Sequence, residues 1–405
     1  MIVVPVIFVS VLCGVGTLSD LSKLGQMGST AFLLYIGTTA VAITMAIFLA
    51  TLLQVGKTAE MVLDGTSAVV LERSLSLKEI VLSWIPLNPF EALTRGDFLQ
   101  LIFLAVLFGV AVIAAGQPGK RVIRFFSDIN SVLTNTIMII MSFAPIGIFA
   151  LITKLAYGTG FVTLAALSQY VLVLILALII QVVVVYGAIL RMTTPYNIVV
   201  FLKKMASTML FAFSTSSSNA CIPVVLRTVK EQFHVKPAVA QFVIPLGATV
   251  NMDGTAIMQG VATVFITNAY GLDLMMTDYL TIILMATVAS IGTAGVPGVG
   301  FITLTMVLNQ IGLPADSIAI LFGVDRLIDM LRTAVNVSGD AMVSVVVNER
   351  FMQSTAEREE HFQAREQKIP YSETKQYNRR VSSVRTLRSS IKKRKQNRES
   401  AQGKD

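Results

Sequence analysis

Residues 325–340, DRLIDMLRTAVNVSGD, place five polar side chains on one face of an expected helix. Asp325, Asp329, Arg332, Asn336 and Asp340 follow one another at intervals of 4, 3, 4 and 4 residues, which keeps them on one side of an α-helix. The polar stripe is about 22 Å long, most of the thickness of the hydrocarbon core of a bilayer. Ionisable side chains at that depth mark a ligand site or a transport path. The alternative is the solvent-facing side of an ordinary amphipathic helix.

The composition decides between these two interpretations. The chain of 405 residues is 54% hydrophobic and 14% charged, and its mean hydropathy is +0.72. Soluble domains carry about a quarter charged residues, so the sequence is that of an integral membrane protein. The two cysteines, Cys13 and Cys221, are too few for a disulfide framework or a metal cluster.

The positive charge of the chain is concentrated at its C-terminal end. Residues 348–405 hold 15 Lys and Arg against 8 Asp and Glu, which accounts for 7 of the 8 net positive charges. The segment is polar and lacks apolar periodicity, so we predict a basic, disordered tail. On a membrane protein, such a tail marks the cytoplasmic side and can contact anionic lipid. We do not expect it to bind nucleic acid.

The N-terminal half, residues 1–190, is predicted to be mostly scaffold. Its start, 1–19, is apolar but has no basic n-region, so it is not a secretory signal. Residues 56–98 are more polar and predict a loop with a re-entering segment. Further spans are predicted at 31–53, 99–116, 134–157 and 161–190, with the segments GQPGKRVIRFFSD and YGTG separating the last three.

The span 31–53 carries three polar side chains, Tyr35, Thr38 and Thr39, within about one helical turn. The two threonines could simply hydrogen-bond to the backbone of their own helix. The other interpretation is a polar site shared with another span.

Two later segments, 196–231 and 277–313, each contain two short apolar arms around a polar or glycine-rich tip. The first tip is STSSSN (214–219), and the second is GTAGVPGVG (292–300). Short, interrupted apolar segments in corresponding positions are typical of helices broken near the middle of a membrane, where freed backbone groups bind ligands. The alternative for the serine-rich tip is a polar loop at the membrane surface.

Between these segments, the motif NMDGT (251–255) interrupts another apolar span. Asn and Asp beside Gly disfavour a continuous helix, so the span 237–270 is predicted to unwind here. Carboxylate, amide and backbone oxygens suit an alkali or alkaline-earth ion. A proton-carrying aspartate and a plain polar loop are the alternatives.

Read together, TSSSNACIP, NMDGT, GTAGVPGVG and DRLIDMLRTAVNVSGD resemble the dicarboxylate/amino acid:cation symporter family, which contains the glutamate and aspartate transporters. The resemblance covers about residues 1–348. It implies an all-α polytopic membrane protein with the glutamate-transporter-like fold: eight spans, inverted repeats, two re-entrant helical hairpins and a homotrimer. Because the chain opens inside what resembles the second span, the family's first span is expected to be missing.

The resemblance also divides the chain. It implies scaffold and trimerisation spans in 1–190, with 31–54 contributing to the transport core as well. The core itself, 196–347, would comprise hairpin 196–231, the unwound span 237–270, hairpin 277–313 and the polar span 316–347.

The family's substrate site maps onto the polar stripe and both tips. Arg332 resembles the partner of a substrate side-chain carboxylate, which a guanidinium can grip in bidentate fashion. Asp329 resembles the partner of the substrate's amino group. Asp325 is expected only to orient its neighbours, Arg326 or Arg332. The implied substrate contacts are Ser217, Ser218, Thr255, Val296, Gly300, Asp329, Arg332, Thr333 and Asn336.

The family's sodium sites map onto three sets of residues. Gly247, Asn251, Asn336 and Asp340 resemble the first site. The second site is resembled by Tyr35, Thr38, Thr39, Asn251 and Asp253. The third is resembled by the backbone of Thr249, Met252, Ser290, Ile291 and Thr293. Some relatives use protons instead, so the coupling ion stays open.

The implied function is a secondary active symporter in the cell membrane that imports L-glutamate or L-aspartate with Na⁺ by elevator-type alternating access. No cofactor beyond the co-transported ion is expected. A proton-coupled or C4-dicarboxylate symporter of the same family is the alternative. An intramembrane hydrolase is disfavoured because His234 and His361 accompany no membrane motif, and a passive channel needs no Arg/Asp pair.

Overall fold

The structure is a computed structural model that describes residues 3–16, 21–57, 85–95, 98–143, 146, 149–150, 153, 167–291, 295 and 298–351. No β-strand occurs in these ranges, so the all-helical prediction is confirmed there. The elements are α1 (Val3–Gly16), α2 (Leu21–Leu52), α4 (Pro89–Arg95), α5 (Phe98–Ala114), α6 (Gln117–Ser142), the π-helical turn η1 (Gln181–Tyr186), α8 (Gly187–Thr193), α9 (Ile198–Thr215), α10 (Ser218–Phe233), α11 (Pro237–Val250), α12 (Asp253–Ala269), α13 (Met276–Ile291), α14 (Val299–Gln310), the 3₁₀ helix η2 (Ala315–Leu321) and α15 (Phe322–Arg350).

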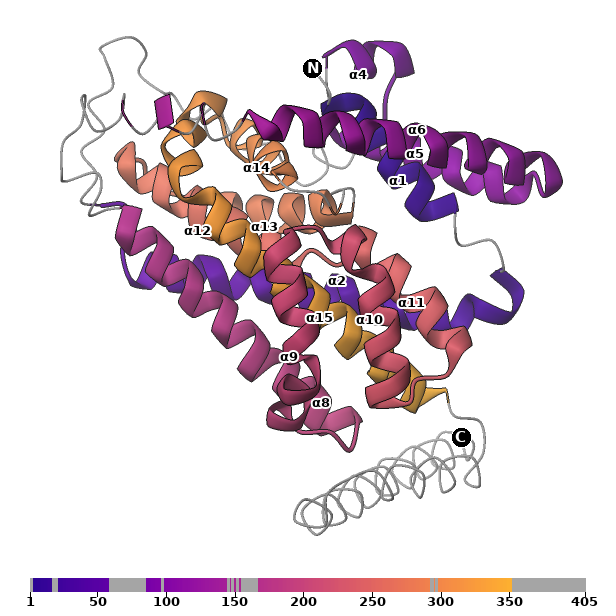
Figure 1. The fold of residues 1–405 in the computed structure, drawn as a ribbon. Coiled ribbons are helices and arrows are strands. Elements are labelled where there is room, and N and C mark those ends of the chain that lie inside the picture. Colours follow the sequence, from indigo (N-terminus) through magenta and orange to yellow (C-terminus); the bar gives the residue numbers. More distant parts are fainter. Residues whose placement is uncertain are drawn as a thin grey trace, which may run out of the picture.

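Helix α15, which carries the polar stripe, runs through the middle of the helical body (Figure 1). It contacts α2, α8, α9, α10, α11 and α12 as well as both η elements. All five side chains of the stripe are buried. The interpretation as a solvent-facing stripe is therefore wrong.

Helices α1, α5 and α6 lie together at one edge of the molecule (Figure 1). Phe8 and Phe126 pack edge to face, with ring centroids 6.2 Å apart, inside a small apolar cluster shared by these helices. The segment predicted to separate two spans here is helical, because Gln117–Ser142 forms one continuous helix. Basic and apolar residues recur in this segment with helical periodicity. Because the segment carries several charges, its sequence suggested a polar linker between two spans.

Helices α9 and α10 fold back on each other around the serine-rich tip, at Ser216 and Ser217. Ser216 ends α9 in the left-handed region with φ 50°. Ser217 caps α10, and its side chain accepts a hydrogen bond from Ala220 N at 3.3 Å. The Thr208 and Thr228 hydroxyls, 2.7 Å apart, join the two arms.

The unwound span is interrupted over a shorter stretch than the motif suggested. Helix α11 ends at Val250 and α12 begins at Asp253, so only Asn251 and Met252 lie outside both helices. Asp253 occupies the first turn of α12, where a carboxylate complements the helix dipole.

Several predicted features lie outside the described residues. They are residues 58–84 of the predicted loop, the spacer YGTG, most of the second tip (292–294 and 296–297) and the tail from residue 352 onward. The arms beside the second tip, α13 and α14, are described and contact each other. The family's inverted repeats and the re-entry of both hairpins into the membrane stay predictions.

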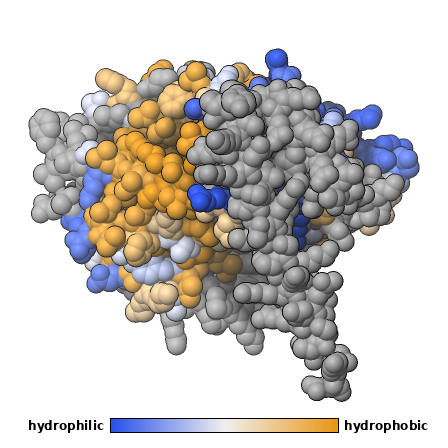
Figure 2. Space-filling model, turned by 90° about the horizontal axis from the view of Figure 1, so that it is seen from below, coloured by the Kyte–Doolittle hydropathy of each residue, from blue (hydrophilic) through white to orange (hydrophobic). Residues whose placement is uncertain are grey.

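Four described helices are long and apolar enough to cross a membrane: Met27–Leu52, Leu167–Thr193, Ile198–Thr215 and Phe322–Arg350. A broad apolar surface covers one side of the molecule (Figure 2). Large apolar side chains such as Leu33, Phe48, Leu172 and Leu210 are exposed on three of these helices. Lipid is the natural solvent for such residues.

Candidate substrate and cation sites

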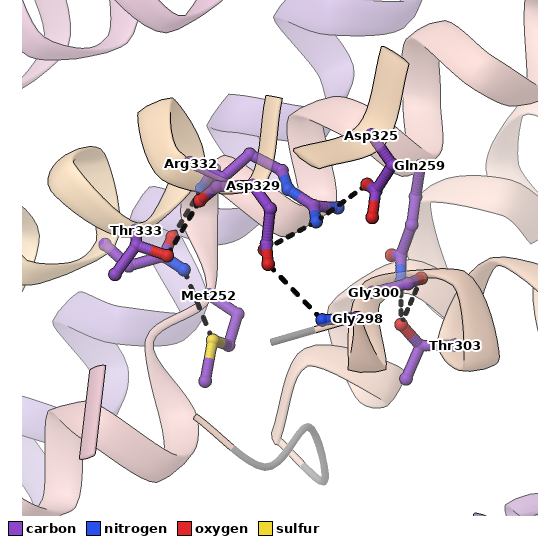
Figure 3. A network of polar contacts seen from close by, with 11 residues as sticks. Met252, Gln259, Gly298, Gly300, Thr303, Asp325, Asp329, Arg332 and Thr333 are labelled. Atoms are coloured by element: carbon purple, nitrogen blue, oxygen red, sulfur yellow. Dashed lines mark hydrogen bonds and ion pairs between the residues drawn. The ribbon is translucent and has the colours of Figure 1, made fainter. Parts of the chain in front are cut away.

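The guanidinium of Arg332 is the centre of the polar stripe. The side chain is 1% exposed, and its Nη2 donates to Asp329 Oδ1 at 2.7 Å and to Asp325 Oδ1 at 3.2 Å (Figure 3). Its Nε and Nη1 are buried and have no hydrogen-bond partner in the described part of the chain. Leaving buried charged donors unpaired is costly. The site is therefore suited to a ligand that brings acceptors to these nitrogens.

Two glycines bring the start of α14 close to Arg332. Gly298, with φ 80°, donates its backbone N–H to Asp329 Oδ2 at 3.3 Å (Figure 3). A Cβ on Gly300 would clash with Arg332 Nη1. The structure thus brings Gly300, Asp329 and Arg332 together, while their role as substrate contacts stays a prediction. The prediction for Asp325 as a partner of Arg332 also agrees with this geometry.

The remaining predicted substrate contacts flank this centre. Thr333 Oγ1 donates to the Asp329 carbonyl at 2.8 Å, one turn back along α15. Asn336 Oδ1 accepts from Gly254 N at 2.7 Å, which joins α15 to the start of α12. Thr255 is 6% exposed in that same first turn of α12.

The first tip reaches the second through Gly295. Ser217 Oγ donates to the Gly295 carbonyl at 2.7 Å, and Asn219 N donates to the same oxygen at 3.2 Å. Ser218 is buried at the start of α10. Val296, predicted to close the pocket, lies outside the described residues. The two tips nevertheless meet at the residue before it.

Asp253 forms the first oxygen-rich centre. Its carboxylate is fully buried, and Oδ1 accepts from Thr39 Oγ1 at 2.6 Å and from Thr38 Oγ1 at 3.4 Å. Thr38 also donates to Tyr35 O at 3.1 Å, within its own helix. Thr38 therefore lies closer to an acceptor of its own helix than to Asp253, whereas Thr39 contacts Asp253.

Asp340 forms the second centre, beside α11. Asn251 Nδ2 donates to Asp340 Oδ1 at 2.9 Å and to the Asn336 carbonyl at 3.2 Å. A Cβ on Gly247 would clash with Asp340 Oδ1 and come within 2.6 Å of Tyr35 Oη. The structure thus places the hydroxyl of Tyr35, predicted at the Asp253 centre, beside the Asp340 centre, where it donates to the Val243 carbonyl at 3.0 Å.

The third predicted set is only partly described. Ser290 Oγ donates to Thr287 O at 2.9 Å and lies 3.5 Å from Val250 O, which brings the end of α13 to the end of α11. Thr249 Oγ1 donates to Leu246 O at 2.9 Å, and Met252 Sδ accepts from Asn336 Nδ2 at 3.3 Å. Ile291 ends α13. Thr293 lies outside the described residues.

The sequence reasoning missed two partners of Asp253 on the helix Leu167–Thr193. Gln181 Nε2 and Tyr186 Oη donate to Asp253 Oδ2 at 2.9 and 2.8 Å. A lone glutamine in an apolar run was the available signal. Sequence reasoning also missed Gln259 Nε2, which donates to Thr303 Oγ1 at 2.6 Å behind Gly300 (Figure 3).

The arrangement combines a carboxylate-binding guanidinium with two buried aspartates surrounded by oxygen and amide groups. The Asn251 amide oxygen is buried and has no hydrogen-bond donor among the described residues. Oxygen ligands of this kind suit hard cations. Together with the apolar helices, this buried polar cluster is that of a multi-pass membrane protein.

The comparisons with known proteins agree with this class. The sodium:dicarboxylate symporter family model matches residues 1–350, and the chain belongs to that family. The family and the relatives of this chain are transporters rather than enzymes.

Three relatives illustrate the range of the family. The proton/sodium-glutamate symport protein of Geobacillus stearothermophilus is 33% identical over 355 residues, 86% of this chain and 84% of that protein. The proton/glutamate-aspartate symporter of Escherichia coli (strain K12) is 30% identical over 86% of this chain and 81% of its own length. The C4-dicarboxylate transport protein of Rhodospirillum rubrum is 30% identical over 86% of this chain and 79% of its own length.

Proposed function

We propose that this protein imports acidic amino acids, L-glutamate or L-aspartate, together with Na⁺. The observation that carries the proposal is the buried Arg332, which has two unpaired nitrogens and two aspartates beside it. A substrate side-chain carboxylate can accept from Nη1 together with Nη2 in bidentate fashion once Nη2 leaves Asp329. When it does, Asp329 becomes available to the substrate's ammonium group while Asp325 stays with the arginine.

The pairing of Arg332 with Asp329 favours an amino acid over a plain dicarboxylate. A C4-dicarboxylate would satisfy the guanidinium but would bring a second negative charge near Asp329. Relatives named as C4-dicarboxylate transport proteins make this the competing substrate class. The glutamate symporters among the relatives support the first choice.

We assign the co-transported cations to the Asp253 and Asp340 centres. Both carboxylates are buried, and no Lys or Arg side chain among the described residues pairs with them. A buried carboxylate without a cationic partner is costly, so a bound cation would stabilise it. Relatives named for both proton and sodium coupling leave H⁺ as the alternative.

Coupling would arise at the second hairpin. Its tip reaches Asp329 through Gly298, and its α13 arm ends beside Val250, near the Asp340 centre. If ion and substrate both favour the closed tip, each strengthens the binding of the other. We further propose the elevator movement of the core 196–347 within a homotrimer, with the tail in the cytoplasm.

The test is uptake of radiolabelled aspartate by proteoliposomes that contain the purified protein. A Na⁺ gradient is imposed first, with choline as the replacement cation, and then a proton gradient without Na⁺. We expect accumulation driven by the inward Na⁺ gradient and competition by glutamate. Accumulation driven by the proton gradient alone would favour H⁺ coupling, stronger competition by succinate would favour a C4-dicarboxylate carrier, and indifference to both gradients would reject symport.

A further inference from the structure

The π-helical turn η1 brings two polar side chains of an apolar helix to one carboxylate. In an α-helix, residues five apart point about 140° away from each other. A π-helical turn bonds residue i to residue i+5, so its first and last side chains are more nearly aligned. Gln181 and Tyr186, the ends of this turn, both reach Oδ2 of Asp253.

The two carboxylate oxygens of Asp253 thereby accept hydrogen bonds from two different helices. Oδ1 faces the hydroxyls of Thr38 and Thr39 on α2, while Oδ2 faces the two donors on η1. A threonine hydroxyl can rotate and offer its oxygen to a cation, because it is both donor and acceptor. The amide nitrogen of Gln181 can only donate. The Oδ1 side can therefore reorganise on cation binding, whereas the Gln181 amide keeps donating to Oδ2.

The surroundings of η1 hold these two donors rigidly. Gln181 and Tyr186 are fully buried. A Cβ on Gly339 would come within 2.6 Å of Tyr186 Oη, so α15 packs directly against the hydroxyl. Gln181 Nε2 also lies 3.4 Å from the Thr38 carbonyl. The Gln181 amide oxygen is buried and has no donor among the described residues, so the bonds that orient this side chain are those of its Nε2.

We propose that Gln181 and Tyr186 are positioning residues of the Asp253 cation site. They hold Oδ2 so that Oδ1, with Thr38 and Thr39, presents a preorganised set of oxygens to the ion. This inference rests on the proposed cation coupling and names the residues that set the affinity of one of its sites. Partners that orient a metal-binding carboxylate influence affinity about 10- to 100-fold.

The test is the Na⁺-dependent thermal stabilisation of the detergent-solubilised, full-length protein, titrated with NaCl against choline chloride at constant ionic strength. Tyr186→Phe and Gln181→Met each remove one donor to Oδ2 at nearly constant volume. Tyr196→Phe is the matched control, because the buried hydroxyl of Tyr196 donates to the Phe233 carbonyl and not to Asp253. We expect both variants to raise the half-saturating Na⁺ concentration about tenfold, and the control to leave it unchanged.

A purely structural role would lower the melting temperature in choline without moving the half-saturating Na⁺ concentration. The same variants are therefore also assayed for uptake, where the Na⁺ concentration at half-maximal rate should rise and the rate at saturating Na⁺ should stay near that of the wild type. If one variant fails to fold, the other variant decides between a positioning role and a purely structural role. Wild-type protein that Na⁺ does not stabilise would overturn the proposed coupling and this inference together. Wild-type stabilisation with unchanged half-saturation in both variants would overturn this inference alone.

Discussion

Arg332 is the residue on which the proposed substrate class rests. Its guanidinium is held on one side by Asp325 and Asp329, whereas Nε and Nη1 remain unpaired. Nη1 and Nη2 form one edge of the guanidinium, which a planar carboxylate can grip with both oxygens. The flanking Asp329 then selects for a cationic group on the same ligand.

Replacing Arg332 with serine should abolish the preference for acidic amino acids. Losing one partner of a buried charge pair costs about 3 kcal/mol or more, which corresponds to about 100-fold weaker binding of aspartate. Arg332→Lys should restore binding only in part, because an ammonium lacks the planar fork. The measurement is competition by unlabelled aspartate in an uptake assay.

The control for this prediction is Arg227→Ser, which removes an arginine that is exposed on α10 and pairs with Glu231. It should leave competition unchanged. Aspartate that competes with Arg332→Ser as well as with the wild type would show that the assignment of Arg332 is wrong.

A parallel prediction concerns Asp340 and the Na⁺ concentration that uptake requires. Asp340→Asn removes the charge of a fully buried carboxylate while keeping its size. We expect the Na⁺ concentration for half-maximal uptake to rise by about tenfold or more. Asp278→Asn serves as the control, because this carboxylate at the start of α13 is partly exposed and accepts from Met275 N at 2.7 Å. An unchanged Na⁺ requirement in Asp340→Asn would remove this centre from the cation sites.

At the scale of elements, the glycines of the second hairpin set how closely α14 approaches α15. Gly300→Ala would place a methyl group against Arg332 Nη1 and within 3.0 Å of Met258 Cε. We expect this variant to fold but to bind aspartate at least about tenfold more weakly, because the guanidinium must move. Apparent affinity, measured by aspartate-dependent thermal stabilisation, checks this.

Gly37→Ala is the matched control, since a Cβ there meets no atom within 4 Å. It should leave the aspartate affinity unchanged. Wild-type affinity in Gly300→Ala would mean that α14 does not line the substrate site in solution.

The features that could be predicted from the sequence are those in which polar residues stand out from an apolar segment. The stripe on α15 follows helical spacing, and Asn251 with Met252 breaks an apolar run, so both features could be inferred before the structure. The helix through 117–133 was missed because its charges alternate with apolar residues on an amphipathic surface. The meeting of both tips at Gly295 depends on tertiary packing, which no local pattern encodes.

The π-helical turn shows a second limit of sequence reasoning. Gln181 stands in a continuous apolar run, and α-helical spacing would point Gln181 and Tyr186 in different directions. Only the widened turn aligns them on Asp253. The lone glutamine could be flagged as unusual in a membrane span, but its partner could not be named.

At the scale of the whole molecule, the exposed apolar surface must meet lipid or another copy of the chain (Figure 2). We predict a homotrimer, so native mass spectrometry in detergent should give about three times the chain mass of 43.8 kDa. Dilution over a tenfold range should leave this mass unchanged, because large apolar interfaces between membrane helices do not dissociate readily. A mass of one or two chains would contradict the trimer while leaving the two sites within each chain untouched.

We propose that one chain binds an acidic amino acid and Na⁺ at adjacent, coupled sites. Isothermal titration of aspartate into the purified protein, repeated over a series of Na⁺ concentrations with choline as the balance, measures this coupling. Coupling between two ligands is reciprocal, so the aspartate dissociation constant should fall steeply as Na⁺ rises, and aspartate should tighten Na⁺ binding by the same factor. An aspartate dissociation constant that is the same in choline and in Na⁺ would contradict the account.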